Sequence, residues 1–216
     1  MVIYFLSGLG CDRRVFERID LPSGYEMQHL DWVPVDGTET LPAYAAQLSK
    51  KIDDSKPFML AGMSFGGMVA AEIAKIKRPE KLILFSTVAN RRQLPLFYRL
   101  SGKIPLEWLS ARAANLLSMS YLHRYFGPLD RRSKELVTEY FRHLDPVFLR
   151  WTLGHIGRWQ NEEVFPGYLH IHGSEDKTFY ARLTDAQYII PGGGHFCILT
   201  HAQKVNEILR KELQPL

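Results

Sequence analysis

The sequence predicts an α/β fold, in which a mostly parallel sheet of about six strands is flanked by helices. Short apolar segments of strand length alternate with helical segments over the first 90 residues and again from residue 161 onward. Between these two parts, the apolar positions of residues 91–160 repeat at helical spacing. Strands that are apolar at nearly every position are typical of a parallel sheet, because helices cover both of its faces.

The first part of the chain predicts alternating strands and helices. Strands are expected at 2–6, 25–30, 56–64 and 81–88. The first helix is expected to begin near Thr38 to Thr40, at residue types that cap helices, and its apolar side chains recur three and four residues apart. The second helix, over 66–76, follows the third strand directly and consists mostly of small and apolar residues. This alternation indicates parallel strands joined by helices.

The second part of the chain begins with helices and then returns to the sheet. Helices are expected at 111–126, 133–144 and 146–159, further strands at 167–173 and 186–194, and a last helix at about 200–213. We therefore expect residues 1–90 and 161–216 to form an α/β core and residues 91–160 to form a helical insertion. Ligands of such sheets bind at the carboxyl ends of the strands, where long insertions tend to lie. The alternative is a surface excursion with no role.

Composition and charge limit the function classes. Hydrophobic residues make up 46% of the chain and charged residues 23%, which is ordinary for a soluble globular protein. The net charge of +4 comes from residues 91–163, which hold 12 Lys and Arg against 7 Asp and Glu. This excess could attract an anionic ligand, but it is too small to predict a nucleic-acid or membrane partner.

The two cysteines and the start of the chain suggest in which cellular compartment the protein resides. Cys11 and Cys197 are too few for a disulfide framework or a zinc site, and we interpret them as buried small apolar residues. The chain opens on a short apolar run with no basic residue before it, which indicates a strand rather than a signal peptide. No segment approaches the roughly 18 apolar residues of a membrane helix. We therefore expect a cytoplasmic protein.

One hydroxyl group stands at the junction of the third strand and the second helix. In the segment GMSFG, Gly62 and Gly66 lie two residues before and after Ser64. A strand that turns directly into a helix strains the corner residue and leaves no room for side chains at the flanking positions. Such a turn exposes the serine oxygen beside the N–H of Phe65 at the start of the helix. We predict that Ser64 is a nucleophile; the alternative is that it only caps the helix.

A serine nucleophile needs a base, and the base needs an acid that orients it. His195 follows a glycine run at the end of one predicted strand, and Asp176 follows the end of the strand before it. Both are expected at the sheet edge that carries Ser64. We therefore predict His195 as the base and Asp176 as the acid, with Glu175 and Asp185 as alternative acids.

The remaining histidines that we considered have less favourable positions. His170 and His172 share a face of one predicted strand, and we interpret them as structural, with His172 able to tie the acid loop by a hydrogen bond. The others belong to the last helix or to the helical insertion, and they are His123, His143, His155 and His201.

An acyl-transfer site also needs two backbone N–H donors for the oxygen that becomes negative. We expect one from Phe65 and the other from Leu9, in the loop SGLGCD after the first strand. The segments LSGLGCDRRVF, GMSFGG, HGSED and GGGHF, in this order, resemble the α/β-hydrolase superfamily over almost the whole chain.

The resemblance implies a nucleophile, an acid and a base at Ser64, Asp176 and His195, and oxyanion donors at Leu9 and Phe65. It also implies that residues 91–160 are a helical cap, or lid, of the kind found in small esterase-like members. Members typically read His-Gly where this chain has Ser7-Gly8, a change that leaves the backbone donors in place.

These residues predict hydrolysis of a carboxylic ester with a small to medium acyl group, through an acyl-enzyme and with no metal or organic cofactor. The alternatives on the same triad are a thioesterase, another acyl-chain hydrolase or transferase, a hydrolase of carbon–carbon bonds, and a slow-turnover ligand receptor. The predicted partner is thus a small-molecule ester or thioester, and we expect a monomer or homodimer.

Aromatic side chains of the insertion could line an apolar acyl pocket. They are Phe97, Tyr98, Trp108, Tyr121, Tyr125, Trp151 and Trp159. We select Phe97, Trp151 and Trp159 as candidate substrate-binding residues. The alternative for each is a place in the core of the insertion itself.

Overall fold

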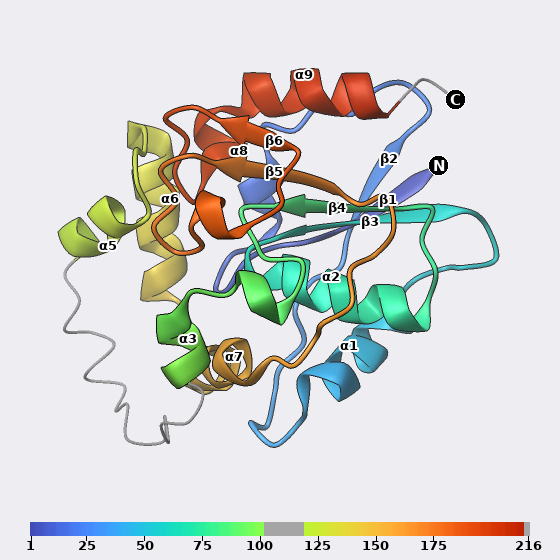
Figure 1. The fold of residues 1–216 in the computed structure, drawn as a ribbon, viewed down its shortest axis with the longest axis horizontal. Helices are drawn as coiled ribbons and strands as arrows, with labels where there is room; N and C mark the ends of the chain where they lie inside the picture. Colours follow the sequence, from blue (N-terminus) through green and yellow to red (C-terminus); the bar gives the residue numbers. More distant parts are fainter. Residues whose placement is uncertain (102–118, 214–216) are drawn as a thin grey trace.

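The computed structural model describes residues 1–101 and 119–213. Its centre is a six-stranded sheet in which all neighbouring strands are parallel, in the order β2-β1-β3-β4-β5-β6 (Figure 1). The strands are β1 (Val2–Leu6), β2 (Glu26–His29), β3 (Phe58–Met63), β4 (Lys81–Phe85), β5 (Leu169–Gly173) and β6 (Tyr188–Ile190). The α/β sheet predicted from the sequence is confirmed, and every strand occurs where it was expected along the chain.

Helices cover both faces of the sheet (Figure 1). One layer contains α1 (Leu41–Ser49) and α2 (Phe65–Ile76); the other contains α8 (Cys197–Thr200) and α9 (Ala202–Glu212), next to the 3-10 helix η1 (Arg13–Phe16). Alternate residues of β1 divide between the layers: Tyr4 and Leu6 pack with α1 and α2, whereas Ile3 and Phe5 pack with α9. This division explains why the strand is apolar at every position.

A helical insertion follows β4 and leads back to β5. It begins with the 3-10 helix η2 (Arg91–Gln93), and its described helices are α3 (Leu96–Ser101), α5 (Met119–Tyr125), α6 (Arg131–Arg142) and α7 (Pro146–Arg158). Contacts join α3 to α7 and α5 to α6. The insertion lies beside the carboxyl ends of the strands (Figure 1), which is the edge where ligands of such sheets bind.

Individual helices differ from the sequence prediction in two places. Of the helix expected at 111–126, the part over Met119–Tyr125 is present as α5, and residues 102–118, which include Trp108, lie outside the described residues. The last helix, expected at about 200–213, is present as α9, but the short helix α8 before it was not predicted; the two are separated at His201, whose φ of −124° and ψ of 32° are not helical. The sequence has neither glycine nor proline at this point, so the pattern did not mark the break.

Candidate active site

Ser64 occupies a sharp turn between β3 and α2. Its φ of 54° and ψ of −125° belong to a region that residues with a side chain rarely adopt. A side-chain carbon at Gly62 would lie 2.6 Å from the Cα atom of Gly67, and one at Gly66 would overlap the carbonyl group of Ser7. The close approach of β1, β3 and α2 therefore requires glycine at both positions of the motif, as the sequence predicts.

Ser64, His195 and Asp176 form a continuous chain of hydrogen bonds. Nε2 of His195 lies 2.9 Å from Oγ of Ser64, and Nδ1 of His195 lies 2.8 Å from Oδ2 of Asp176. The three residues follow the ends of β3, β6 and β5, and all of them are buried. A neutral imidazole that donates from Nδ1 to a carboxylate has Nε2 free to accept the serine proton. The geometry is that of a Ser-His-Asp triad.

Asp176 is surrounded by hydrogen-bond donors. Its Oδ1 accepts from the backbone N–H groups of Thr178 at 2.8 Å and Phe179 at 3.1 Å. Its Oδ2 lies 2.8 Å from Nδ1 of His195 and 3.2 Å from Nε2 of His172. Burial alone would raise the pKa of Asp176, but the charge of His195 and the hydrogen bonds from both histidines outweigh it and hold that pKa below its ordinary value. The ionised carboxylate can therefore orient the imidazole.

His195 lies against the helical insertion. Its backbone N–H donates to the carbonyl oxygen of Phe126 at 2.8 Å. The ring of Phe126 stacks on the imidazole with the centroids 5.7 Å apart, and the ring of Phe179 lies 5.9 Å away at an angle of 66°. A side chain at Gly194 would overlap the carbonyl oxygen of Phe126. The glycine before His195 thus lets the insertion approach the imidazole.

The alternative acids have other surroundings. Oδ2 of Asp185 accepts from Nε2 of Gln93 at 2.9 Å, and Glu175 is exposed. His172, expected only to tie the acid loop, does so through Nε2, which lies 2.7 Å from the carbonyl oxygen of Phe179. Its additional contact with Asp176 was not predicted from the sequence. The spacing of His172 and Asp176, four residues apart across the end of a strand, could have indicated this contact.

The loop after β1 runs directly beside the serine. A side-chain carbon at Gly8 would lie 3.3 Å from Cβ of Ser64. The loop is closed by two hydrogen bonds, from the N–H of Cys11 to the carbonyl oxygen of Gly8 at 3.0 Å and from Oγ of Ser7 to the carbonyl oxygen of Cys11 at 2.7 Å. Leu9 lies within this closed turn. The backbone of the predicted donor loop is therefore held next to the hydroxyl group.

Two of the aromatic residues predicted at the substrate are anchored in the interior. Trp151 is 4% exposed, and its Nε1 donates to the carbonyl oxygen of Glu39 at 2.8 Å. Trp159 is also 4% exposed, and its Nε1 donates to Oε1 of Glu72 at 2.7 Å. Phe97, on α3, is 72% exposed.

Aromatic contacts connect these residues to the triad. The ring of Trp151 lies 5.8 Å from that of Phe65, the residue after the serine. On the other side, Phe97 contacts Tyr98 at 5.5 Å, and Tyr98 contacts Phe179 at 5.6 Å between ring centroids. Because Phe179 contacts the imidazole of His195, a row of rings leads from α3 to the triad.

Both cysteines are free thiols in the interior. Burial raises the pKa of the Cys197 thiol to about 12 and also raises the pKa of Cys11. Neutral buried thiols are unreactive, which agrees with their interpretation as small apolar residues. Within residues 1–101 and 119–213, no group of three or more His, Cys, Asp and Glu residues could hold a metal ion. No described helix has the length and apolar character needed to cross a membrane.

A cleft of about 590 Å³ lies away from the triad, near the carboxyl end of α2. Its lining includes Ala71, Ala74, Lys75, Arg78, Asn161 and Val164. Ser64 lies at the opposite end of α2, and no triad residue lines this cleft. The cleft is therefore separate from the candidate active site.

Solved structures with a similar fold include enzymes of several kinds. A thermophilic esterase from Thermogutta terrifontis is 17% identical with a TM-score of 0.64, and the match covers 99% of this chain and 89% of that one. MenH from S. aureus is 19% identical with a TM-score of 0.72 and coverage of 99% and 93%. The RedJ thioesterase from the prodiginine pathway of Streptomyces coelicolor is 17% identical with a TM-score of 0.66 and coverage of 98% and 85%.

At these identities the structural likeness concerns the fold. No curated protein matches the chain in sequence. The sequence model of the alpha/beta hydrolase family, in contrast, matches residues 3–208. This match spans nearly the whole chain, including the serine turn, the acid loop and the histidine loop, and the parallel sheet and hydrogen-bonded triad described above agree with it. The chain therefore belongs to the α/β-hydrolase family.

Proposed function

We propose that this chain is a serine hydrolase that cleaves carboxylic esters with a small to medium acyl group through an acyl-enzyme. The observation that carries the proposal is the hydrogen-bonded chain from Ser64 through His195 to Asp176, with the serine held at a strained turn. A strained, buried arrangement of this kind is retained where it serves a reaction.

The first half of the reaction forms the acyl-enzyme. Oγ of Ser64 attacks the ester carbonyl carbon while Nε2 of His195 takes its proton. Asp176 stabilises the imidazolium that results. The carbonyl oxygen becomes negative and receives hydrogen bonds from the backbone N–H groups of Leu9 and Phe65. The tetrahedral intermediate then breaks its bond to the alcohol oxygen, which takes the proton from His195 and leaves as the alcohol.

The second half repeats these steps with water. His195 accepts a proton from a water molecule, whose oxygen attacks the acyl carbon bound to Ser64. The intermediate then breaks its bond to Oγ of the serine, which takes back the proton from the imidazolium, and the carboxylic acid leaves. The serine proton leaves on the alcohol and a proton from water replaces it, so Ser64 and His195 end in their starting states and no step changes an oxidation state.

We assign residues 91–160 as the cap over this site, with Phe97, Trp151 and Trp159 as candidate contacts of the acyl group. Phe97 is supported by its exposure and by the row of rings that leads from α3 to Phe179. Trp151 is supported by its contact with Phe65. Trp159 has the weakest support, because its indole is buried against Glu72.

A thioesterase is the second candidate. The excess of basic residues in 91–163, with 12 Lys and Arg against 7 Asp and Glu, would favour an anionic thiol carrier such as a phosphopantetheine group. The RedJ thioesterase, whose fold is similar, gives this candidate further support. A slow receptor on the same triad differs in one observable property, because it would be acylated once and then stall.

The test is hydrolysis of p-nitrophenyl esters from acetate to laurate, and of the matching acyl thioesters, by the wild type and by Ser64→Ala. A fluorophosphonate probe counts reactive serines in each protein. We expect turnover and one label per chain in the wild type. Ser64→Ala loses labelling, and its kcat falls by about 10⁴- to 10⁶-fold. The chain length that gives the highest kcat/KM measures the acyl pocket.

Other outcomes separate the alternatives. Faster turnover of thioesters than of esters of the same acyl length favours the thioesterase. Labelling of Ser64 without turnover of either substrate favours the receptor. Absence of both labelling and turnover contradicts the serine-hydrolase assignment.

A further inference from the structure

Two side chains outside the triad bind carbonyl groups beside the serine. Oγ1 of Thr87 donates to the carbonyl oxygen of Ser64 at 2.6 Å. Nε1 of Trp32 donates to the carbonyl oxygen of Gly8 at 3.2 Å. Each of these carbonyls belongs to the peptide unit whose N–H is one of the two oxyanion donors of the proposed mechanism. Neither side chain was singled out from the sequence.

Fixing a carbonyl group fixes the N–H of the same peptide unit. A trans peptide is planar, so its C=O and N–H bonds point in opposite directions. Each carbonyl oxygen also accepts a second hydrogen bond: Ser64 from the N–H of Gly67 at 2.9 Å, and Gly8 from the N–H of Cys11 at 3.0 Å. Both lone pairs of each oxygen are thus occupied. Among the described residues, neither opposing N–H has a hydrogen-bond acceptor.

The topology of the sheet brings the two side chains to these positions. Thr87 follows the end of β4, the neighbour of β3, and Trp32 follows the end of β2, the neighbour of β1. Thr87 is fully buried, and a side-chain carbon at Gly67 would lie 2.8 Å from its Oγ1. Gly67, the last glycine of GMSFGG, therefore leaves the space that the threonine hydroxyl occupies.

The indole of Trp32 is held by packing as well. Its ring lies 5.7 Å from that of Phe65 and 5.6 Å from that of Phe148 on α7. The same rigid indole therefore contacts the helical insertion and donates the hydrogen bond to Gly8. Its N–H therefore has a fixed direction toward the loop.

We propose that Thr87 and Trp32 are positioning residues of the oxyanion hole, each of which aims one backbone N–H at the oxygen that becomes negative. This inference rests on the proposed function. Because the negative oxygen exists only in the transition state and the tetrahedral intermediate, the two residues act on kcat and leave KM nearly unchanged.

The expected loss of kcat in each variant can be estimated from the known effect of removing one oxyanion donor. Complete removal of such a donor costs about 10²- to 10³-fold in kcat. Loss of the supporting bond misdirects the donor but does not remove it, so each variant should lose about 10- to 100-fold.

The test compares variants that differ by one polar group. Thr87→Val removes the hydroxyl and keeps the shape, whereas Thr87→Ser keeps the hydroxyl. Trp32→Phe removes the N–H and keeps a ring, and it tests the second position independently of whether the valine variant folds. Thr138→Val is the matched control, because Oγ1 of Thr138 donates to the carbonyl oxygen of Lys134 on α6 at 2.7 Å, away from the triad.

Three quantities are measured on the best substrate of the wild type: kcat per fluorophosphonate-labelled site, KM, and the affinity for an alkylboronic acid, whose serine adduct is tetrahedral. We expect Thr87→Val and Trp32→Phe to lower kcat and boronate affinity by the same factor, with KM within about twofold. Thr87→Ser and Thr138→Val should behave as the wild type.

The outcomes distinguish this inference from the proposed function. Wild-type turnover with an unchanged kcat per labelled site in both variants overturns the inference alone. A fall in kcat without a parallel fall in boronate affinity also overturns it, because the effect would then lie outside the tetrahedral state. A wild type that neither turns over nor labels contradicts the proposed function, and the inference falls with it.

Discussion

His172 is a second histidine that contacts Asp176 of the triad. Its Nε2 lies 2.7 Å from the carbonyl oxygen of Phe179 and 3.2 Å from Oδ2 of Asp176. Both partners can only accept, so Nε2 carries a proton, and in a neutral ring Nδ1 is then an acceptor. Nε2 of His170 lies 3.2 Å from that nitrogen and donates to it in that arrangement. The two buried histidines thus form a directed chain that ends on the carboxylate.

This chain predicts a loss of rate when its last donor is removed. His172→Leu leaves Asp176 with one donor fewer on Oδ2, and the carboxylate then holds the imidazole less firmly. We expect kcat to fall about tenfold, the effect of losing a hydrogen bond to a charged group, with little change in KM. His172→Gln, whose amide can donate from a similar position, should recover most of the rate.

The measurement is kcat per labelled site, together with KM, for the wild type, His172→Leu and His172→Gln. Equal losses in His172→Leu and His172→Gln would show that packing, rather than the hydrogen bond, is responsible. Unchanged kcat in His172→Leu would show that Asp176 does not depend on this donor.

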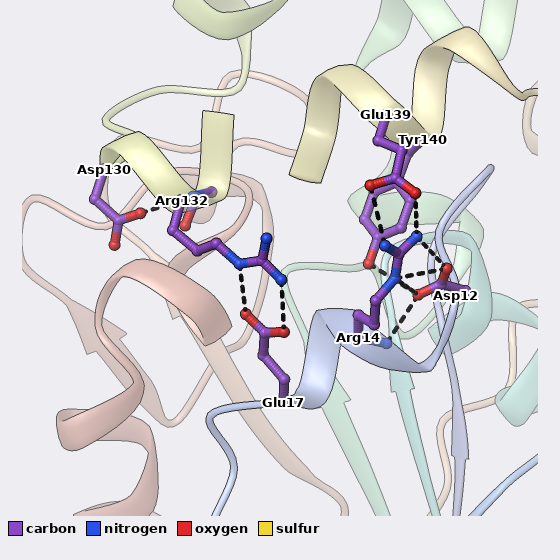
Figure 2. Close-up of polar contacts among 8 residues, drawn as sticks. Asp12, Arg14, Glu17, Asp130, Arg132, Glu139 and Tyr140 are labelled. Atoms are coloured by element: carbon purple, nitrogen blue, oxygen red, sulfur yellow. Dashed lines mark hydrogen bonds and ion pairs between the residues drawn. The ribbon is translucent and has the colours of Figure 1, made fainter. Parts of the chain in front are cut away.

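Among the elements of the fold, η1 and α6 are joined by charged side chains (Figure 2). The guanidinium of Arg14 lies between two carboxylates, with Nη2 2.7 Å from Oδ2 of Asp12 and Nη1 3.0 Å from Oε2 of Glu139. The hydroxyl of Tyr140 donates to Oδ1 of Asp12 at 3.2 Å. Because η1 directly follows the loop that holds Leu9, the network ties this loop to the helical insertion.

The network predicts a salt-dependent contribution to stability. Arg14→Met keeps the apolar stem of the side chain and removes both ion pairs. The side chains of Arg14 and Glu139 are 37% and 46% exposed, so solvent screens the pair, and we expect a loss of about 1 kcal/mol in the free energy of unfolding. Most of this difference should disappear in about 1 M NaCl.

Urea unfolding of both proteins at low and high salt measures this effect. Arg131→Met is the control, because Arg131 pairs with Glu135 on the same helix and its side chain is 94% exposed. We expect no measurable loss in that variant. A loss in Arg14→Met that does not change with salt would point instead to packing of the arginine over the ring of Tyr140, 5.5 Å from the ring centroid.

The sequence predicts elements and the positions of the triad well, because both depend on local patterns. Apolar runs mark the strands, and the glycines around Ser64 and before His195 mark the turns that carry these two residues. Thr87 and Trp32 have no such local mark. Their positions follow only from the order of strands in the sheet, which the sequence pattern alone did not provide.

Interactions between the insertion and the core were also beyond prediction. The ion pair between Arg14 and Glu139 joins residues 125 positions apart. The burial of Trp159 against Glu72 depends on how α7 meets α2. An amphipathic pattern indicates that a helix has a buried face, but it does not indicate which partner covers that face.

For the whole molecule, the histidines give stability a definite dependence on pH. Burial lowers the pKa of four of the described histidines, which are His29, His123, His155 and His170. Below the ordinary histidine pKa of about 6.5, the unfolded chain therefore binds more protons than the folded chain. The contribution of these histidines to the free energy of unfolding should be complete above that pH, and it should decrease as the pH is lowered.

His170 provides the sharpest test of this dependence. It is fully buried, and burial lowers its pKa to about 3, with the nearby His172 adding to the effect. Between pH 7 and about pH 4, its protonation in the unfolded chain should remove about 3 kcal/mol of stability. His170→Gln can still donate to His172 but cannot gain a proton, so its stability should fall by about 3 kcal/mol less over the same range.

Urea unfolding at several pH values between these limits measures the difference, and His143→Gln serves as the control because His143 is exposed. Carboxylates contribute equally to the pH dependence of all three proteins and cancel in the comparison. If His170→Gln and the wild type lose stability in parallel, His170 is protonated equally in both states, and its burial does not couple folding to pH. If only His170→Gln has the flatter profile, the buried histidine pair behind Asp176 limits how far the fold tolerates acid.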